Sequence, residues 1–280
     1  MFFTMPKPSQ YFVVACLIFA TATATVIARR ASAADKFAEP VDVSFTAKCD
    51  GTTQKYVVRL PVGFADDQPH ALMIALHGHG SDRWQYATGN RDEVRAARDV
   101  ALKYDMIFVS PDYRATTSWM GPLAEADMVQ ILEELKSKYK IEKTILIGAS
   151  MGGSSSLSFT ALHPELVDGV VSMNGTANHL LYEQFQKFIQ ASFGGTKQEI
   201  PMEYKRRSAE YWPERFTMPL AMSTGGKDTL VPADSCLRLS KVIKKLNPNV
   251  WHIHQPQGGH STTYKDAVAA LEFVCQRTLE

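Results

Sequence analysis

The chain has 280 residues, of which 45% are hydrophobic, and its formal net charge is +1 at pH 7. That length allows one full-sized hydrophobic core, and two small domains are also compatible with it. The near-balance of charge argues against a nucleic-acid partner and against a polybasic membrane-binding surface, because both need an excess of basic side chains.

The N-terminal segment, residues 1–34, differs in composition from the rest of the chain. A weakly basic start is followed by the uncharged stretch YFVVACLIFATATATVIA and then by Ala31-Ser32-Ala33. This order is typical of an export signal cleaved near Ala33 or Ala34. The alternative is an uncleaved membrane anchor, since about 18 apolar residues is close to the lower limit for a span. We therefore expect a periplasmic or extracellular protein that has no membrane contact once the signal is removed.

Cysteine usage agrees with export but does not require a disulfide. Cleavage of the signal would remove Cys16 and leave Cys49, Cys236 and Cys275. Three cysteines can form at most one bridge, and an exported compartment permits that bridge without demanding it. Buried free thiols are the simpler expectation for all three, and the sequence does not fix a pairing.

Strand-like and helix-like segments alternate in the remaining residues, 35–280. The expected strands span residues 43–49, 55–61, 70–78, 106–114, 143–150, 167–175, 218–226 and 249–255, and the expected helices span 91–105, 125–140, 154–164 and 263–279. Asp50-Gly51 is a hairpin turn signal between the first two strands. The alternation predicts one α/β catalytic domain, with an eight-stranded, mostly parallel sheet and helices on both faces.

Residues 176–217 are longer than a crossover connection needs. Apolar residues recur there at helical spacing, for example at Leu181, Phe185 and Phe188. We interpret the segment as a small helical insertion over the strand ends, and the alternative is a long surface excursion. Within it, Glu203, Arg206 and Arg207 are expected to form a solvated face.

A candidate nucleophile lies in ILIGASMGG, where Gly148, Ser150 and Gly152 form a Gly-x-Ser-x-Gly string. The string is weak evidence alone, but a predicted strand precedes it and a helix-compatible run follows. In such a strand–turn–helix unit the serine occupies a strained turn, and small neighbours avoid collisions with the strand and the helix. Ser150 is therefore predicted to project its hydroxyl above the sheet, at the N-terminus of a helix.

A serine hydroxyl needs a base, and the base needs a carboxylate to orient it. His260 is the predicted base, because it follows the last strand in the glycine-rich sequence PQGGHST. Asp228 is the predicted orienting group, since it follows the strand ending in STGG. Asp234 is the rival carboxylate, but it lies beyond Pro232 and is expected to begin a helix. The backbone N–H groups of Met151 and His79, the latter in LHGHGSD, are the predicted oxyanion donors.

Other polar and aromatic residues support weaker predictions. Arg114, Trp119 and Met120 follow the fourth strand and are expected to line the substrate pocket, with ordinary loop packing as the alternative. His77-x-His79 and His252-x-His254 have metal-ligand spacing, but the expected Asp and His are absent after the first pair. No metal or cofactor is therefore expected.

Four strings together, HGHG, GASMGG, GGKDTLVP and GGHST, resemble the α/β-hydrolase superfamily over about residues 43–280. The order Ser150, Asp228, His260 is the order of the triad on that sheet. Within the superfamily, CDGTTQKYVVRLP, residues 123–153 and the final GGH resemble single-domain secreted esterases of the feruloyl and acetylxylan esterase or polyhydroxybutyrate depolymerase type. Residues 204–232 also resemble the catalytic domain of prolyl-oligopeptidase-like serine peptidases.

The resemblance implies a serine hydrolase that cleaves small-molecule or polymer-linked carboxylic esters through an acyl-enzyme. The alternative is a prolyl-oligopeptidase-like peptidase. Such peptidases usually carry a β-propeller, and the stretch between Asp35 and His77 is too short for one, which favours the esterase. A hydrolase fold without activity, acting as a binding protein, is a further alternative, although candidates for all three triad residues are present.

Overall fold

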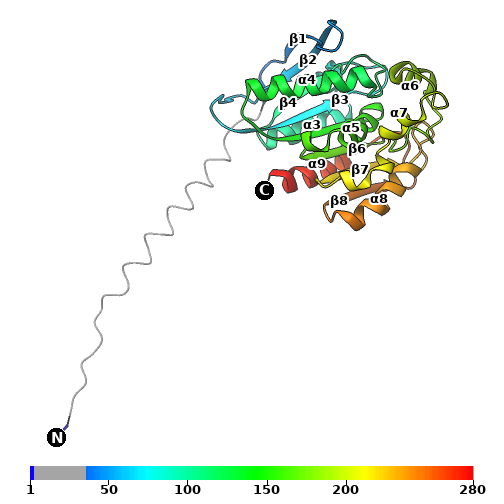
Figure 1. The fold of residues 1–280 in the computed structure, drawn as a ribbon. Helices are drawn as coiled ribbons and strands as arrows, with labels where there is room; N and C mark the ends of the chain where they lie inside the picture. Colours follow the sequence, from blue (N-terminus) through cyan, green and yellow to red (C-terminus); the bar gives the residue numbers. More distant parts are fainter. Residues whose placement is uncertain (3–35, 280) are drawn as a thin grey trace.

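The computed structural model describes residues 1–2 and 36–279, and an eight-stranded sheet runs through it (Figure 1). The strands lie in the order β1-β2-β4-β3-β5-β6-β7-β8. They are β1 (Val41–Thr46), β2 (Thr53–Arg59), β3 (His70–Leu76), β4 (Ile107–Pro111), β5 (Ile141–Ala149), β6 (Gly169–Met173), β7 (Leu220–Gly225) and β8 (Val250–Gln255). The β1–β2 and β2–β4 pairs are antiparallel, and the other neighbours are parallel. The prediction of an eight-stranded, mostly parallel sheet is confirmed.

Helices cover both faces of this sheet (Figure 1). They are α2 (Trp84–Thr88), α3 (Asp92–Lys103), α4 (Pro122–Lys138), α5 (Met151–Leu162), α6 (Gln186–Phe193), α7 (Pro201–Arg206), α8 (Asp234–Leu246) and α9 (Tyr264–Leu279). The side chains of strand β3 contribute to two hydrophobic cores, one on each face of the sheet. Leu72, Ile74 and Leu76 join the core under α4, α5 and α8, whereas Met73 and Ala75 join the core under α3 and α9. This follows from the alternation of side chains along a strand.

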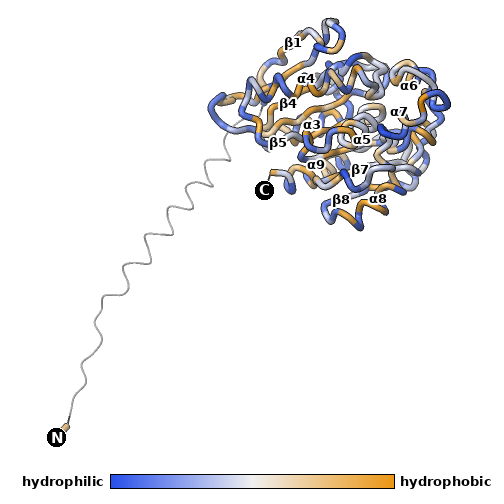
Figure 2. The backbone as a smooth tube through the Cα atoms, viewed as in Figure 1, coloured by the Kyte–Doolittle hydropathy of each residue, from blue (hydrophilic) through white to orange (hydrophobic). Residues whose placement is uncertain are grey.

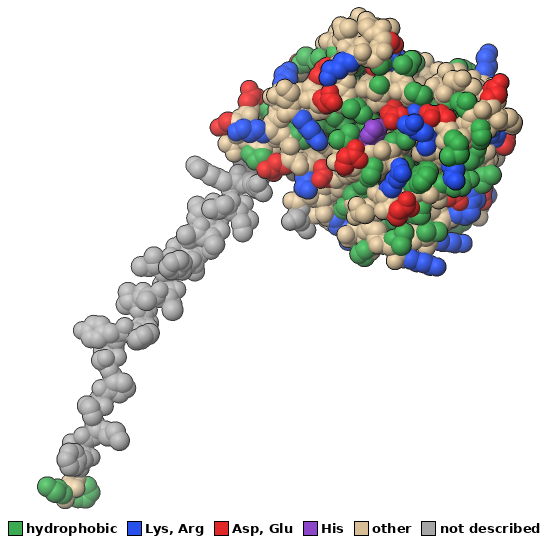
Figure 3. Space-filling model, in the orientation of Figure 1, with side chains coloured by type: hydrophobic (Ala, Val, Ile, Leu, Met, Phe, Trp, Pro, Cys, Tyr) green, Lys and Arg blue, Asp and Glu red, His purple; other side chains and the backbone are tan. Residues whose placement is uncertain are grey.

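The interior is apolar and the periphery is mixed in charge. Hydrophobic segments gather in the central strands, as Figure 2 shows, because those strands are buried on both faces. On the face drawn in Figure 3, acidic and basic side chains are interspersed. None of the helices in the described residues is long and apolar enough to cross a membrane. The expected export signal lies outside the described residues, apart from its first two positions.

Some element boundaries differ from the sequence prediction. Helix α5 begins at Met151, three residues before the expected start at residue 154, because Gly152 and Gly153 belong to its first turn. Glycine disfavours helices in general, and here close packing against the strands overrides that preference. Helix α2 was not expected at all. Asp234 is the first residue of α8.

Between β6 and β7 the chain forms α6, α7 and two short 3-10 turns. Arg207 joins this region to the rest of the fold: it lies 2.6 Å from Glu125 of α4 and 2.5 Å from Glu203, and it donates a 2.7 Å hydrogen bond to the carbonyl of Met120. The expectation of a solvated face is wrong for Arg207, which is only 1% exposed. The two carboxylates neutralise its charge, so burial is possible.

Candidate active site

Ser150 occupies a strained turn between β5 and α5. Its backbone has φ = 58° and ψ = −121°, a conformation that residues other than glycine rarely adopt. A hydrogen bond of 2.8 Å from its N–H to the carbonyl of Met173 ties the turn to the end of β6. The turn holds the hydroxyl of Ser150 at the N-terminus of a twelve-residue helix.

Three glycines around Ser150 are required by close backbone contacts. A Cβ atom at Gly148 would collide with the backbone of Gly152, and one at Gly152 would collide with the carbonyl of Leu76. A Cβ at Gly153 would lie 2.8 Å from the carbonyl oxygen of Met173. The strand, the helix and their neighbours can therefore approach closely enough to form this turn only if these positions lack side chains.

The structure brings together the serine, histidine and aspartate that the sequence singled out. His260 Nε2 lies 2.8 Å from Ser150 Oγ, and His260 Nδ1 lies 2.6 Å from Asp228 Oδ2. The side chain of Asp228 is fully buried, and that of His260 is 21% exposed. The second carboxylate oxygen of Asp228 accepts hydrogen bonds of 2.9 Å from the N–H groups of Leu230 and Val231. Both oxygens of the buried carboxylate are thus satisfied.

The loops that carry Asp228 and His260 are held against one another by backbone contacts. Gly226 N–H donates to the carbonyl of Gln255, and Lys227 N–H donates to the carbonyl of Gly258, each at 2.8 Å. A Cβ at Gly225 would collide with the carbonyls of Gly258 and Gly259. The close approach of the loops therefore explains the two glycines that precede Asp228, Gly225 and Gly226.

A second set of polar residues supports the His260 loop and was missed by sequence reasoning. Thr262 Oγ1 lies 2.5 Å from Asn174 Oδ1 and 2.8 Å from Ser223 Oγ. Asn174 follows β6 with a left-handed backbone, φ = 48°. The Asn-Gly dipeptide at the end of the predicted strand 167–175 was the available signal, because asparagine tolerates this conformation.

The two predicted oxyanion donors have free backbone N–H groups. Met151 is the first residue of α5, so its N–H has no intrahelical partner. Within the described residues, the N–H of His79 donates no hydrogen bond. The N–H of the preceding Gly78 donates a 2.7 Å hydrogen bond to the side-chain oxygen of Gln85, which anchors this loop.

The imidazole of His79 is held among aromatic side chains. Trp119 Nε1 lies 3.2 Å from His79 Nδ1, and the rings of Phe185 and Phe188 each lie 4.6 Å from the His79 ring. Burial and the neighbouring His77 imidazole lower the pKa of His79. His79 therefore contributes a neutral, aromatic surface beside Ser150 at neutral pH.

A cavity of about 210 Å³ opens at the triad. It is lined by Gly78, His79, Gln85, Arg91, Glu93, Ala149, Ser150, Asn174, Phe185, Leu230, His260, Ser261 and Thr262. None of the three residues expected to line the pocket does so. Trp119 and Met120 are fully buried, and Trp119 packs against His79. Arg114 instead forms ion pairs of 2.7 Å with Asp50 and Asp127. A position after a strand does not reveal the direction of the side chain.

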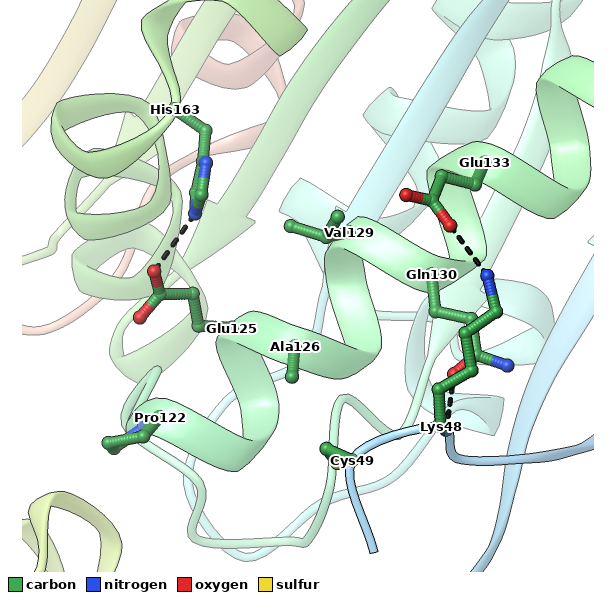
Figure 4. Close-up of a pocket in the computed structure, with 9 residues that line it drawn as sticks. All are labelled: Lys48, Cys49, Pro122, Glu125, Ala126, Val129, Gln130, Glu133 and His163. Carbon is green, nitrogen blue, oxygen red and sulfur yellow. Dashed lines mark hydrogen bonds and ion pairs between the residues drawn. The ribbon is translucent and has the colours of Figure 1, made fainter. Parts of the chain in front are cut away.

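A larger groove of about 490 Å³ lies along α4, and Ser150 does not line it (Figure 4). Figure 4 shows two ion pairs in it, Glu125 with His163 at 2.9 Å and Lys48 with Glu133 at 2.7 Å. Cys49, an exposed free thiol, also lines the groove, whereas Cys236 and Cys275 are buried free thiols. Cys49 thus differs from the expectation of burial.

In both histidine pairs, ring nitrogens contact other protein groups. The ring nitrogens of His77 contact the carbonyls of Gly78 and Asp112, and those of His252 and His254 contact the hydroxyl of Thr224. In the part of the chain that the structure describes, no group of three or more histidine, cysteine or acidic side chains could hold a metal ion.

This fold, with a strained serine between a strand and a helix, is that of the α/β hydrolases. The sequence model described as "alpha/beta hydrolase fold" matches residues 108–203. No curated protein matches the sequence. The family match and the structural neighbours below agree on the α/β-hydrolase fold.

Three solved structures illustrate the range of these neighbours. A putative dipeptidyl aminopeptidase IV from Bacteroides ovatus has a TM-score of 0.65 and 17% identity, over 87% of this chain and 36% of its own. A fluorophosphonate-binding serine hydrolase F from Staphylococcus aureus has a TM-score of 0.66 and 15% identity, over 86% and 98%. A ferulic acid esterase has a TM-score of 0.65 and 15% identity, over 87% and 99%. This chain thus spans well under half the length of the peptidase and nearly the whole length of the other two. At 15–17% identity, these likenesses show a shared fold.

Proposed function

We propose that this chain is an exported serine hydrolase that cleaves carboxylic esters. The observation that carries the proposal is the continuous chain of contacts from Asp228 through His260 to Ser150, at 2.6 and 2.8 Å, beside a cavity. Those distances are within the range in which a base can take the proton of a nucleophile. Export is proposed from the N-terminal sequence alone.

In the proposed mechanism, Ser150 Oγ attacks the acyl carbon while His260 Nε2 takes its proton. Asp228 holds Nδ1–H of His260 and stabilises the imidazolium that forms. The N–H groups of Met151 and His79 stabilise the negative charge on the carbonyl oxygen. His260 then gives the proton to the departing alcohol, which leaves an acyl-enzyme. Water attacks that ester with His260 again as base, and the carboxylic acid is released.

A serine peptidase is the second candidate, because a putative dipeptidyl aminopeptidase and an acylaminoacyl peptidase are among the structural neighbours. Those neighbours are more than twice as long as the matched region, since only 36% and 42% of their chains are covered. A ferulic acid esterase and an S-formylglutathione hydrolase are covered almost completely, at 99% and 100% of their chains, which favours the esterase proposal.

The test is a panel of p-nitrophenyl esters of increasing acyl length and of aryl acyl esters, run beside a peptide p-nitroanilide. We expect ester turnover and labelling by a fluorophosphonate, with both abolished in Ser150→Ala. Undiminished turnover in Ser150→Ala would refute the mechanism. Preferential cleavage of the anilide would support the peptidase instead.

A further inference from the structure

One charged pair lines the cavity at Ser150 and has no part in the mechanism above. Arg91 directly precedes α3, and Glu93 lies in the first turn of that helix. Arg91 Nε is 2.9 Å from Glu93 Oε1. Among the described residues that line the cavity, Arg91 is the only lysine or arginine and Glu93 is the only carboxylate. Arg91 and Glu93 are therefore the guanidinium and the carboxylate that a charged substrate group can meet among these lining residues.

The two members of the pair differ greatly in exposure. The side chain of Glu93 is 9% exposed, whereas that of Arg91 is 64% exposed. A carboxylate that is so largely removed from water needs a compensating charge, and Arg91 supplies it through the Nε edge of its guanidinium. The nearly buried carboxylate thus holds one edge of the Arg91 guanidinium beside the cavity.

The terminal nitrogens of the Arg91 guanidinium, Nη1 and Nη2, donate no hydrogen bond to any residue that the structure describes. The arginines around it differ in this respect. The terminal nitrogens of Arg83 contact Asp42 and Asp112, and those of Arg98 donate to the carbonyls of Tyr86 and Gly89. Arg91 lines the cavity, and a guanidinium with undonated Nη groups can bind a carboxylate by two parallel hydrogen bonds.

We infer that Arg91 forms an anion subsite, and that the ester substrate carries a carboxylate group that this subsite binds. The inference rests on the proposed function and names the substrate class within it: esters that are anionic in either the acyl or the alcohol part. Glu93 is the positioning residue of the subsite, because it acts only through Arg91.

The opposite interpretation is that Glu93 binds a substrate ammonium group, as a peptidase acting on a free amino terminus would require. Its geometry is less suitable, since Glu93 is nearly covered and already neutralised by Arg91. A cationic ligand would have to displace the guanidinium and then reach a carboxylate largely closed to solvent. Preference for a cationic substrate would therefore overturn the inference.

The kinetic test compares substrates that differ only in charge. On the acyl side these are mono-p-nitrophenyl adipate, p-nitrophenyl hexanoate and p-nitrophenyl ε-aminocaproate, and on the alcohol side meta-acetoxybenzoate and meta-acetoxybenzamide. We expect the anionic member of at least one series to have the highest kcat/KM. Arg91→Gln should lower the anionic-to-neutral ratio of kcat/KM by about tenfold, because a charged hydrogen-bonded contact is lost. Arg91→Lys should lower the ratio less, since it keeps the charge but loses the fork.

The matched control is Arg95→Gln, on the same helix, because Arg95 pairs with Asp92 and does not line the cavity. This variant should leave the ratio unchanged. Added salt should reduce the advantage of the anionic substrate in the wild type and should have little effect in Arg91→Gln. An anionic-to-neutral ratio that Arg91→Gln leaves intact in both series would overturn the inference.

A binding measurement separates this inference from the proposed function. In Ser150→Ala, the affinities of the same ligands are measured by calorimetry, with and without Arg91→Gln, so no turnover is needed. Tighter binding of an anionic ligand that depends on Arg91 supports the subsite even if no ester is hydrolysed. Equal affinity for anionic and neutral ligands refutes the subsite, while ester turnover by the wild type would still support the serine hydrolase.

Discussion

Asp228 and His260 are 32 positions apart in the sequence, and their side chains meet at 2.6 Å in a region where the carboxylate is fully buried. Two backbone N–H groups donate to Oδ1 of Asp228. These bonds orient the carboxylate so that Oδ2 accepts the hydrogen bond from His260. This arrangement fixes the tautomer of the imidazole that would serve Ser150.

The first prediction concerns that carboxylate. Asp228→Asn should lower kcat about a thousandfold or more, because an amide can stabilise the wrong tautomer of His260 and cannot stabilise an imidazolium. The measurement is kcat for a p-nitrophenyl ester, together with the thermal unfolding midpoint. Lys227→Ala, the neighbouring exposed side chain, is the control and should retain activity. A loss of less than about tenfold in Asp228→Asn would contradict the proposed role.

The second prediction concerns Gln85, whose side-chain oxygen anchors the N–H of Gly78 at 2.7 Å, next to the proposed donor His79. Gln85→Leu leaves that N–H without its partner, so the loop should lose its fixed position. We expect kcat to fall about tenfold, which is less than the loss of an oxyanion donor itself, while KM changes little. Thr88→Ala, at the end of the same helix α2, is the control. Equal kcat values for the two variants would show that Gln85 does not position the loop.

The third prediction uses two glycines of the paired loops. Gly225→Ala would place a Cβ against the carbonyls of Gly258 and Gly259, whereas a Cβ at Gly259 meets nothing within 4 Å. We expect Gly225→Ala to displace the His260 loop, to destabilise the fold by about 1–3 kcal/mol as overpacking does, and to reduce kcat strongly. Gly259→Ala should change both quantities much less, although it is adjacent to His260. Chemical denaturation and ester turnover measure the two effects, and the reverse ranking would contradict the contact that we describe.

The fourth prediction is an acid sensitivity centred on Glu125, which joins α4 to Arg206, Arg207 and His163. Burial raises the pKa of Glu125, but the His163 hydrogen bond and the Arg207 and Arg206 charges outweigh burial and lower its pKa from 4.5 to about 2. A carboxyl whose pKa is lower in the folded than in the unfolded chain stabilises the fold above its unfolded pKa. That contribution is therefore lost as the pH falls from about 4.5 to about 2.

Urea denaturation at several pH values tests this, with Glu125→Gln as the variant. At pH 7 the variant should be less stable by about 3 kcal/mol, because Arg207 stays buried without one of its partners. Its free energy of unfolding should also change less than that of the wild type between pH 5 and pH 2.5. Glu133→Gln, on the same helix but in an exposed pair with Lys48, should cost less than about 1 kcal/mol. Parallel pH curves for wild type and Glu125→Gln would refute this explanation.

Much of the fold could be predicted from the sequence because its signals are local. Continuous apolar runs such as residues 70–78 predicted buried parallel strands, and the sheet has a strand at each of the eight predicted places. The glycines around Ser150 indicated a strained turn, and the backbone of Ser150 has the corresponding positive φ. Ser150, Asp228 and His260 could be selected because each follows a predicted strand in a glycine-rich segment.

The remaining features depend on contacts between distant segments. Whether Arg207 is solvated or buried is decided by Glu125 and Met120, more than 80 positions away. Arg114 follows a strand, as a pocket residue would, yet its side chain forms ion pairs with Asp50 and Asp127 and does not line the cavity. In their place Phe185, Arg91 and Glu93 line the cavity, and no sequence pattern marked them as pocket residues.

The sequence by itself determined the order of strands and helices, the strained serine turn and the candidate acid and base. The tertiary structure alone decided which charges are neutralised, which side chains surround Ser150, and which arginine keeps free hydrogen-bond donors. The physical reason is that hydrophobic periodicity and glycine requirements act over a few neighbouring residues. The burial of a charge, by contrast, depends on whichever distant partner the fold brings within a few ångströms of it.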